Sequence, residues 1–275
     1  MNPHKEQSIS PLQILISIIL NKRLLFSLIK RDVVGRYRGS AMGLLWAFLN
    51  PVLMLAVYSF VFSVVFKARW AGGSDSKTEF ALVLFAGLLV FNLFSECINR
   101  APSLILGNAN YVKKVIFPLE ILPIVALGSA AFHFLISVVV WLMFYFMFFG
   151  IPSLTILQFP LVILPLILIT LGFSWLLASL GVYMRDVAQI VGLMTTILMF
   201  LSPIFYPITA LPEEYRGFMQ ISPITFVVEQ ARDTMIWGKG INWEVWWAHT
   251  SLSTIVAWLG FAWFQKTRKG FADVL

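Results

Sequence analysis

The sequence predicts an all-helical integral membrane protein, and three features support this: composition, long charge-free runs and the distribution of basic residues. The types Ala, Val, Ile, Leu, Met, Phe, Trp, Tyr and Cys make up 59% of the 275 residues, and charged residues make up 12%. Soluble domains carry about twice that share of charge, and a mean hydropathy of +0.86 leaves too little polar material to cover a water-exposed surface. Composition therefore excludes a soluble enzyme, a disordered protein and a nucleic-acid-binding module. The single cysteine, Cys97, excludes a disulfide within the chain.

Six apolar segments are long enough to cross the hydrocarbon core, which takes about 20 helical residues. The stretch 121–184 contains no Asp, Glu, Lys or Arg and can form two helices, because Gly-Ile-Pro-Ser at 150–153 supplies a turn between them. The expected spans are 41–66, 80–98, 121–149, 154–183, 188–205 and 245–264.

The basic residues are unevenly distributed between the two sides that these spans define. With six spans both termini lie on one side, and 14 of the 20 Lys and Arg residues fall there. The positive-inside rule then places both termini in the cytoplasm. On this interpretation the net charge of +7 is an orientation signal, so no nucleic-acid partner is expected.

The N-terminal region is expected to lie on the membrane surface. Residues 12–20 are apolar but too few to span, and no small-residue cleavage site of a signal peptide follows them. Polar residues fall mostly on one side of a helix drawn through 12–38, although leucines interrupt that side. The sequence therefore predicts an imperfect amphipathic helix in the cytoplasmic interface over 12–38, in contact with membrane lipids.

The chain carries no recognisable catalytic or metal-binding motif. The phosphate loop G-x-x-x-x-G-K-[ST] is absent, because Gly238-Lys239 has no glycine at the required upstream position. The three histidines are too scattered for a zinc motif, and no nucleophile elbow or acidic pair lies within a span. We therefore expect no cofactor or metal on this chain, and we expect the energy for any work on a substrate to come from another protein.

Two ionisable residues within the spans each admit a structural and a functional interpretation. Intramembrane carboxylates are often functional, but Arg100 lies four residues after Glu96, which is the favourable order for an ion pair along a helix. His133 could relay protons, but one isolated histidine makes no relay chain. A neutral histidine bonded to a neighbouring helix is the simpler interpretation.

One group of aromatic side chains lies on a single helix face. The first expected span carries Phe48, Tyr58, Phe62 and Phe66 within an arc of about 80° at 100° per residue. Such a stripe can be ordinary packing, or it can be the wall of a conduit on which sugar rings stack. The sequence leaves both interpretations open.

The segment before the last expected span, 206–244, is too long for a simple connection. Ser222 and Pro223 have the residue types of a helix N-cap and first helical position, and Glu229 and Arg232 follow three residues apart. We expect short re-entrant or interfacial helices that close the outer mouth. An ordinary surface loop is the alternative.

Four segments, read together, resemble one family over residues 25–235. In order and spacing they are similar to the permease subunit of ABC-2 polysaccharide exporters, which move O-antigen, capsule and teichoic-acid chains. Ser222 is a mild departure, since the family more often has Asn before this proline. The four segments are KRDVVGRYRGS at 30–40, NANYVKKVIFP at 108–118, YMRDV at 183–187 and SPIFYP at 202–207.

The resemblance implies an ABC-2 permease fold with six spans, assembled as a homodimer around a conduit in the bacterial inner membrane. It implies two copies of a separate ATP-binding subunit, which carry ATP and Mg²⁺ and dock on the cytoplasmic face. It also implies a cargo of polysaccharide linked to a polyprenyl diphosphate.

The basic cluster after the interfacial helix has two interpretations. Arg31, Arg36 and Arg38 could hold the diphosphate of the implied cargo through their guanidinium groups. The same residues could instead anchor the chain to anionic lipids.

The resemblance also assigns two surfaces. The ATPase-coupling surface is expected at Asn110, Lys113, Lys114, Phe117, Arg185 and Asp186, and the outer gate at Pro203, Phe205, Tyr206, Pro207, Ser222 and Pro223. For Arg185 and Asp186 a helix cap with an orientation charge is at least as good an interpretation as a contact with the ATPase.

The leading hypothesis is the membrane subunit of an ATP-driven exporter that moves a polyprenyl-diphosphate-linked polysaccharide to the periplasmic face, without enzymatic activity of its own. The nearest alternative is an ABC-2 permease for a small amphiphile or glycolipid, because fold does not fix cargo. An intramembrane sugar-transfer enzyme would need paired acidic or nucleophilic residues. A passive scaffold would have no ATPase partner.

Overall fold

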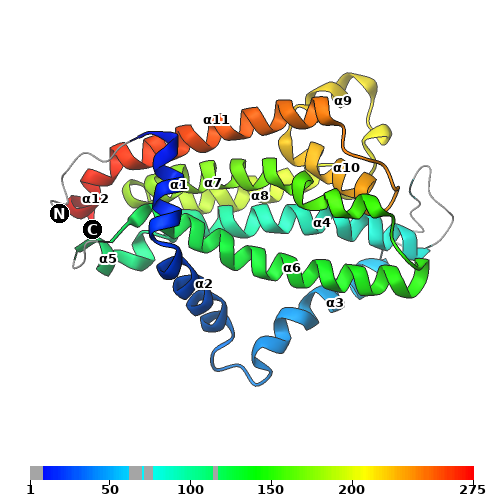
Figure 1. Cartoon of the computed structure of the whole chain (residues 1–275), viewed down its shortest axis with the longest axis horizontal. Coiled ribbons are helices and arrows are strands. Elements are labelled where there is room, and N and C mark those ends of the chain that lie inside the picture. Colours follow the sequence, from blue (N-terminus) through cyan, green and yellow to red (C-terminus); the bar gives the residue numbers. More distant parts are fainter. Residues whose placement is uncertain (1–8, 62–69, 71–76, 114–116) are drawn as a thin grey trace.

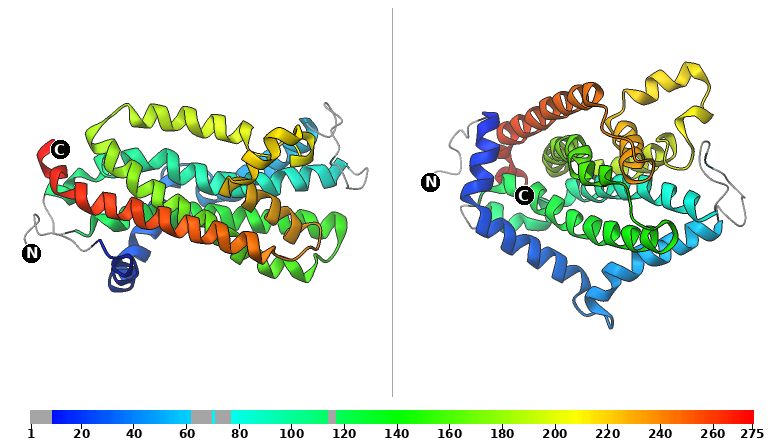
Figure 2. Two further views of the ribbon diagram at one scale, coloured as in Figure 1. Left: turned by 90° about the horizontal axis from the view of Figure 1, so that it is seen from above. Right: turned by 45° about the vertical axis from the view of Figure 1, so that its right-hand side comes forward.

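The computed structural model describes residues 9–61, 70, 77–113 and 117–275, and every regular element within these ranges is a helix. Five long helices run side by side and form the body of the molecule (Figures 1 and 2). The five are α4 (Lys77–Arg100), α6 (Leu122–Phe149), α7 (Phe159–Tyr183), α8 (Val187–Leu201) and α11 (Trp243–Thr267). Short connections join α6 to α7 and α7 to α8, whereas longer segments with helices of their own join α4 to α6 and α8 to α11.

Among the described residues, four helical segments are long and apolar enough to cross a membrane: Gly43–Val61, Thr78–Ser103, Leu119–Phe149 and Leu154–Tyr183. The bent pair α1 (Pro11–Leu20) and α2 (Lys22–Tyr37) makes a fifth if it is counted as one broken span. By the same test α8 is too short at 15 residues, and α11 is less apolar because polar residues interrupt it. The chain is therefore a multi-pass membrane protein, with four or five spans by length and composition where six were expected.

The turn between the third and fourth expected spans is confirmed. Helix α6 ends at Phe149, and Gly150 has a φ of +80°, a conformation that L side chains rarely adopt. The Ser153 hydroxyl then accepts a hydrogen bond from the backbone of Thr155 at the start of η6 (Leu154–Gln158), which leads into α7.

The expected single helix over 12–38 is wrong, because two helices bent by 75° replace it. The break falls at Asn21, whose side chain donates a hydrogen bond of 2.8 Å to the Ser17 carbonyl. Asparagine side chains compete in this way with the helical backbone. Helix α1 crosses one end of the bundle, and α2 descends from it toward α3 (Trp46–Tyr58; Figure 1).

The fifth expected span, 188–205, ends earlier than predicted. Helix α8 stops at Leu201, and Ser202 is extended with ψ of 147°. The residue before a proline is driven out of the helical region by the proline ring, so Pro203 ends the helix. The chain then passes through η7 (Ile208–Ala210), α9 (Glu213–Gln220) and α10 (Pro223–Met235) before α11.

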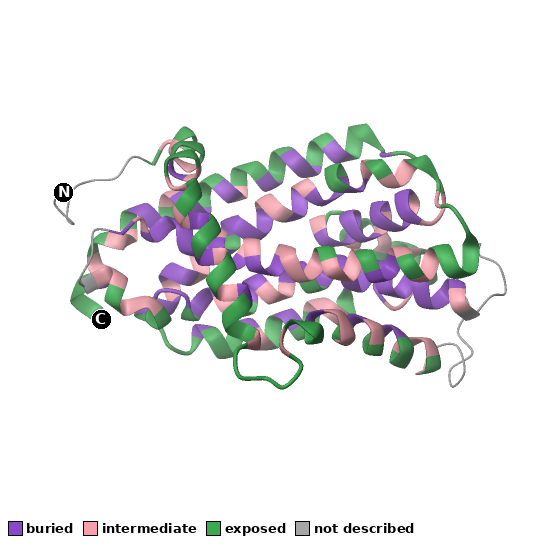
Figure 3. Cartoon of the chain, turned by 60° about the horizontal axis from the view of Figure 1, so that its bottom comes forward, coloured by how far each residue is buried: buried purple, intermediate pink, exposed green. Residues whose placement is uncertain are grey.

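Burial differs sharply among the candidate spans. In Thr78–Ser103, 83% of the most apolar window is buried inside the molecule, whereas the figure is 11% for Gly43–Val61 and for Leu119–Phe149. Figure 3 shows buried residues concentrated in the middle of the bundle and exposed ones along its periphery. Helix α4 is thus the central element, and α3 and α6 present most of their surface outward.

Candidate functional site

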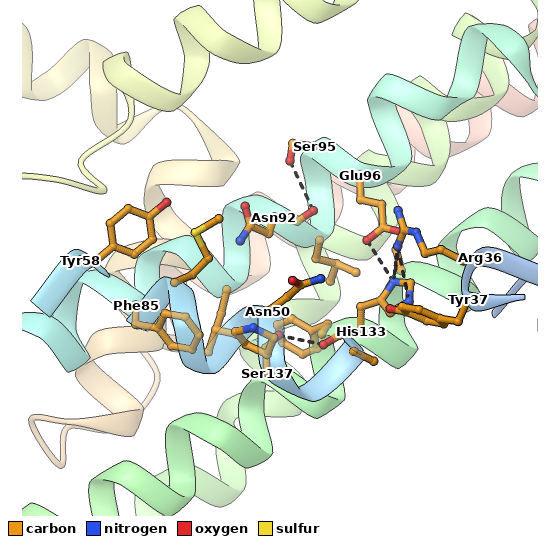
Figure 4. A pocket seen from close by; sticks show the side chains of 17 residues that line it. Arg36, Tyr37, Asn50, Tyr58, Phe85, Asn92, Ser95, Glu96, His133 and Ser137 are labelled. Carbon is orange, nitrogen blue, oxygen red and sulfur yellow. Dashed lines mark hydrogen bonds and ion pairs between the residues drawn. The ribbon is translucent and has the colours of Figure 1, made fainter. Parts of the chain in front are cut away.

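An open cavity of about 450 Å³ lies where α3, α4 and α6 converge, beside the end of α2. Its lining residues recur at helical spacing, so one face of each helix forms one wall. On α4 they include Phe85, Leu89, Asn92 and Glu96. We call this cavity the α3–α4–α6 groove; Figure 4 shows it with its polar side chains.

The end of the groove nearest α2 is charged. The Arg36 guanidinium donates a hydrogen bond of 2.7 Å to the Glu96 carboxylate and lies 2.7 Å from Nδ1 of His133. The same His133 nitrogen is 3.2 Å from Glu96. Arg36 of α2, Glu96 of α4 and His133 of α6 therefore form one cluster. In the sequence, Glu96 lies 60 positions and His133 lies 97 positions from Arg36.

One nitrogen of His133 faces two incompatible partners. A guanidinium can only donate, so a bond from Arg36 requires Nδ1 to be unprotonated. A bond to the Glu96 carboxylate requires Nδ1 to carry a proton. The proton on His133 thus decides whether the ring pairs with α2 or with α4.

The predicted pair of Glu96 with Arg100 is present, but it is the weaker contact. Their closest atoms are 3.9 Å apart, while Arg100 makes two 2.8 Å hydrogen bonds to the carboxylate of Asp32 on α2. The simpler interpretation of His133, a bond to a neighbouring helix, matches its contact with Glu96. Arg36 could not be predicted as the principal partner of Glu96, because helix spacing reveals only contacts within one helix.

The three arginines expected to hold a diphosphate have different surroundings. Arg31 donates a 2.9 Å hydrogen bond to the hydroxyl of Tyr111, outside the groove. Arg36 lines the groove, and Arg38 is exposed after the end of α2. Arg31 and Arg36 contact different elements, since five residues place them about 140° apart around a helix.

The segment expected to couple to an ATPase combines buried and exposed residues. Phe117 is buried and stacks on Tyr111 with ring centroids 4.3 Å apart. Asn110, Arg185 and Asp186 are exposed. Lys113 ends α5 (Ala109–Lys113), and Lys114 lies outside the described residues.

An ion pair between Arg268 and the buried Glu120 carboxylate ties this segment to the helix that follows α11. Arg268 donates hydrogen bonds of 2.7 Å to the Glu120 carboxylate and 2.9 Å to the Phe117 carbonyl. The Ser17 hydroxyl of α1 donates 3.1 Å to the other Glu120 oxygen. Helix α1 and the segment after α11 are thereby joined at one carboxylate.

The expected aromatic stripe is only partly within the described residues. Tyr58 lines the α3–α4–α6 groove, whereas Phe48 is half-buried and outside its lining. Phe62 and Phe66 lie outside the described residues.

The expected outer gate is organised around a residue whose role the sequence did not reveal. The Arg232 side chain is 2% exposed and donates hydrogen bonds to the carbonyls of Val83 (3.1 Å), Pro203 (2.6 Å) and Ile204 (2.7 Å). Its 3.1 Å pair with Glu229 confirms the predicted spacing. Burial lowers the pKa of Arg232 to about 10, and Glu229 opposes that shift, so the guanidinium stays charged at neutral pH.

The remaining expected outer-gate residues lie after the end of α8 and at the start of α10. Phe205 stacks on Phe200 with centroids 5.7 Å apart, and the Tyr206 hydroxyl donates 2.7 Å to the Leu201 carbonyl. Ser222 and Pro223 begin α10, as their residue types predicted. Pro203 is buried and Pro207 is half-buried.

The described residues contain no group of three or more His, Cys, Asp or Glu side chains that could hold a metal ion. What the arrangement offers is a membrane-embedded helix bundle with a polar groove on one side. Comparison with known proteins identifies the family to which this bundle belongs. The model of the ABC-2 type transporter family matches residues 23–236. The chain belongs to this family.

Relatives within the ABC-2 family extend the match to nearly the whole chain. The O-antigen export system permease protein RfbA of Myxococcus xanthus is 29% identical over 252 residues, covering 91% of this chain and 94% of that protein. A permease of the same name from Klebsiella pneumoniae is 25% identical over 253 residues, with coverage of 92% and 95%. The polysialic acid transport protein KpsM of Escherichia coli is 25% identical over 217 residues, with coverage of 77% and 81%.

Proposed function

We propose that this ABC-2 protein is the membrane subunit of an ATP-driven exporter of polysaccharide, with a polyprenyl-diphosphate-linked chain of the O-antigen type as its cargo. The observation that carries the proposal is the near full-length similarity to permeases named for O-antigen export. The sequence lacks a phosphate loop, so ATP and Mg²⁺ are assigned to a separate subunit. The chain itself moves cargo and catalyses no reaction.

The proposed topology has six spans in the bacterial inner membrane with both termini in the cytoplasm. Helix α11 has 25 residues, which at 1.5 Å rise is about 37 Å and exceeds the hydrocarbon thickness. Helix α8 runs alongside the other long helices, so the two complete six (Figure 2). The excess of basic residues on the side of α1 and α12 (Phe271–Val274) supports the orientation.

The proposed assembly is a homodimer with two ATP-binding subunits. The outward faces of α3 and α8 carry large apolar side chains, which suit lipid or a second copy. The exposed Asn110, Arg185 and Asp186 suit a soluble partner on the cytoplasmic face. Burial of Phe117 against the bundle would transmit motion of that partner inward.

The proposed path begins at the basic cluster and ends at the outer gate. Arg31 and Arg38 are exposed and can approach a diphosphate at headgroup level. Arg36 can join them only if its bond to Glu96 opens. At the opposite end, the cluster around Pro203, together with α9 and α10, would close the outer mouth.

The assembly is tested by gentle-detergent purification of the tagged chain from its native cell, with mass spectrometry of the bound proteins. We expect an ATP-binding protein in equal stoichiometry and two permease copies per particle. A particle without an ATPase, under conditions that preserve other transporters, would contradict the proposal.

The diphosphate role is tested by replacing Arg36 and Arg38 together with glutamine. We expect the complex to assemble and surface polysaccharide to be lost, because glutamine keeps length and polarity but cannot pair with a diphosphate. Normal surface polymer in this variant would remove the diphosphate role and leave the export function standing.

A further inference from the structure

The middle of the α3–α4–α6 groove carries two side-chain amides that nothing in the fold uses. Asn50 on α3 and Asn92 on α4 line the groove and are exposed (Figure 4). Within the described part of the chain, neither side-chain amide has a hydrogen-bond partner. Each lies near the middle of a candidate span, Gly43–Val61 and Thr78–Ser103 respectively.

Unpaired amides at this depth restrict what can occupy the groove. Lipid tails offer no hydrogen bond, and each unsatisfied polar group in hydrocarbon costs several kcal/mol. Polar residues inside a membrane accordingly face a water-filled cavity or a polar partner. The groove is therefore suited to water or to a ligand rich in hydroxyl groups.

The charged end of the groove argues against an anionic ligand. The Glu96 carboxylate occupies the guanidinium of Arg36 at 2.7 Å, so an incoming phosphate would have to displace it and would meet its negative charge. The other charged or titratable groups facing this cluster are His133, Tyr37 and Arg100, and Arg100 is engaged by Asp32. The fixed charges of Arg36 and Glu96 cancel, which favours a neutral ligand.

The remaining lining matches the chemistry of a sugar ring. A hydroxyl group both donates and accepts, and amides supply both functions at once, while a carboxylate accepts and a guanidinium donates. Tyr58 and Phe134 add aromatic rings against which the apolar face of a pyranose can pack. A volume of about 450 Å³ lies within the range of small-ligand sites.

We propose that the α3–α4–α6 groove is a binding site for a neutral saccharide unit of the exported polymer, with Asn50 and Asn92 as its contact residues and the Arg36–Glu96 pair at its inner end. The assignment rests on the proposed export function. It leaves Arg36 paired with Glu96 while a saccharide unit is bound, and it places sugar recognition within each protomer. Along α4 the groove extends from Glu96 to Phe85, about 16 Å at 1.5 Å per residue.

The test uses the exporter complex, permease with its ATPase, in lipid nanodiscs. The first probe is oligosaccharide released by mild acid from the surface polysaccharide of the producing strain, freed of phosphate. The second probe is inorganic diphosphate. Binding of each is measured by calorimetry for the wild type and for the double variant Asn50→Leu with Asn92→Leu.

We expect the double variant to bind the oligosaccharide at least tenfold more weakly and diphosphate with unchanged affinity, because each lost hydrogen-bonding group removes several-fold in affinity. The matched control is Asn99→Leu. Asn99 is on the same helix but outside the groove lining, and accepts a 3.0 Å hydrogen bond from Thr195. This control should retain oligosaccharide affinity. Should the double variant fail to assemble, the single Asn92→Ala variant is measured instead, with a several-fold loss expected.

Three outcomes would overturn the assignment. The first is an equal affinity of the wild type and the double variant for the oligosaccharide. The second is a double variant that loses diphosphate binding while it keeps oligosaccharide binding. The third is a phospholipid that copurifies with the wild type, is absent from the variant and is not displaced by oligosaccharide. A failed export function would show itself separately, as a missing ATPase or as normal surface polymer in cells lacking the chain.

Discussion

On one side of the bundle, α7 and α11 approach so closely that a side chain on Gly260 would collide with the Gly172 backbone, and Trp175 packs edge-on against Phe261. On the other side, α3 lies against α4 and α6 across an open groove. The most apolar window of Leu154–Tyr183 is 61% buried, against 11% for Gly43–Val61. The first side has its geometry fixed by backbone contact, whereas the second is free to meet cargo, lipid or another subunit.

The largest expected effect comes from the buried cation Arg232 on α10, which lies away from the open groove and holds α4 to residues 203 and 204. Arg232→Met should lower the free energy of unfolding by about 3–5 kcal/mol, because it removes a buried cation from Glu229 and from the buried carbonyls of Pro203 and Ile204. Thermal and denaturant unfolding of the purified protein in detergent would measure the loss. Arg216→Met is the matched control, since Arg216 is 35% exposed and bonds to carbonyls near the surface. Similar losses in both variants would contradict the assigned role of Arg232.

A second prediction tests whether close backbone packing defines the fixed side. Gly260→Ala should destabilise the protein by about 3 kcal/mol, because the added methyl group would force α7 and α11 apart. Gly192→Ala on α8 should be neutral or stabilising by about 0.5–1 kcal/mol, because no atom lies within 4 Å of the new methyl and alanine favours the helix. The free energies of unfolding of both variants, measured under identical conditions, test this difference. Equal changes in the two variants would contradict the role of close backbone packing.

The smallest expected change in stability belongs to the open side. Glu96→Gln should alter the free energy of unfolding by less than about 1 kcal/mol, because Arg36 is 45% exposed and solvent screens the pair. Surface polysaccharide should nevertheless fall, because the variant frees Arg36 from its fixed position at the end of the groove. The two readouts are unfolding of the purified protein and immunoblotting of surface polymer. A loss of several kcal/mol would show that Glu96 holds α2, α4 and α6 together, so that the groove side too is fixed by its internal contacts.

Helices could be predicted from the sequence where nearby residues determine their positions and ends. Charge-free length located α6 and α7, and the glycine and serine of 150–153 located their turn. Ser222-Pro223 located the start of α10. The break at Asn21 and the early end of α8 were missed, because each depends on one residue overriding an otherwise helical apolar pattern.

The site was predictable only in its parts. Arg36, Glu96 and His133 each attracted attention in the sequence, but their meeting depends on how α2 packs on α4 and α6. Asn50 and Asn92 carried no signal at all, because a lone amide in an apolar helix has no pattern. Arg232 was recognised as a partner of Glu229 on the same helix, while its bonds to Val83 and Ile204 span the fold.

The carboxylate of Glu120 has a consequence for biosynthesis. It binds Ser17 near one end of the chain and Arg268 near the other. At about 5–20 residues per second, a ribosome delivers Ser17 on the order of tens of seconds before Arg268. Helix α1 is therefore made well before the cation that completes its contact with Glu120. A chain interrupted before Arg268 would leave the buried Glu120 carboxylate without its cation, so the join between α1 and the segment after α11 cannot form before that segment is synthesised.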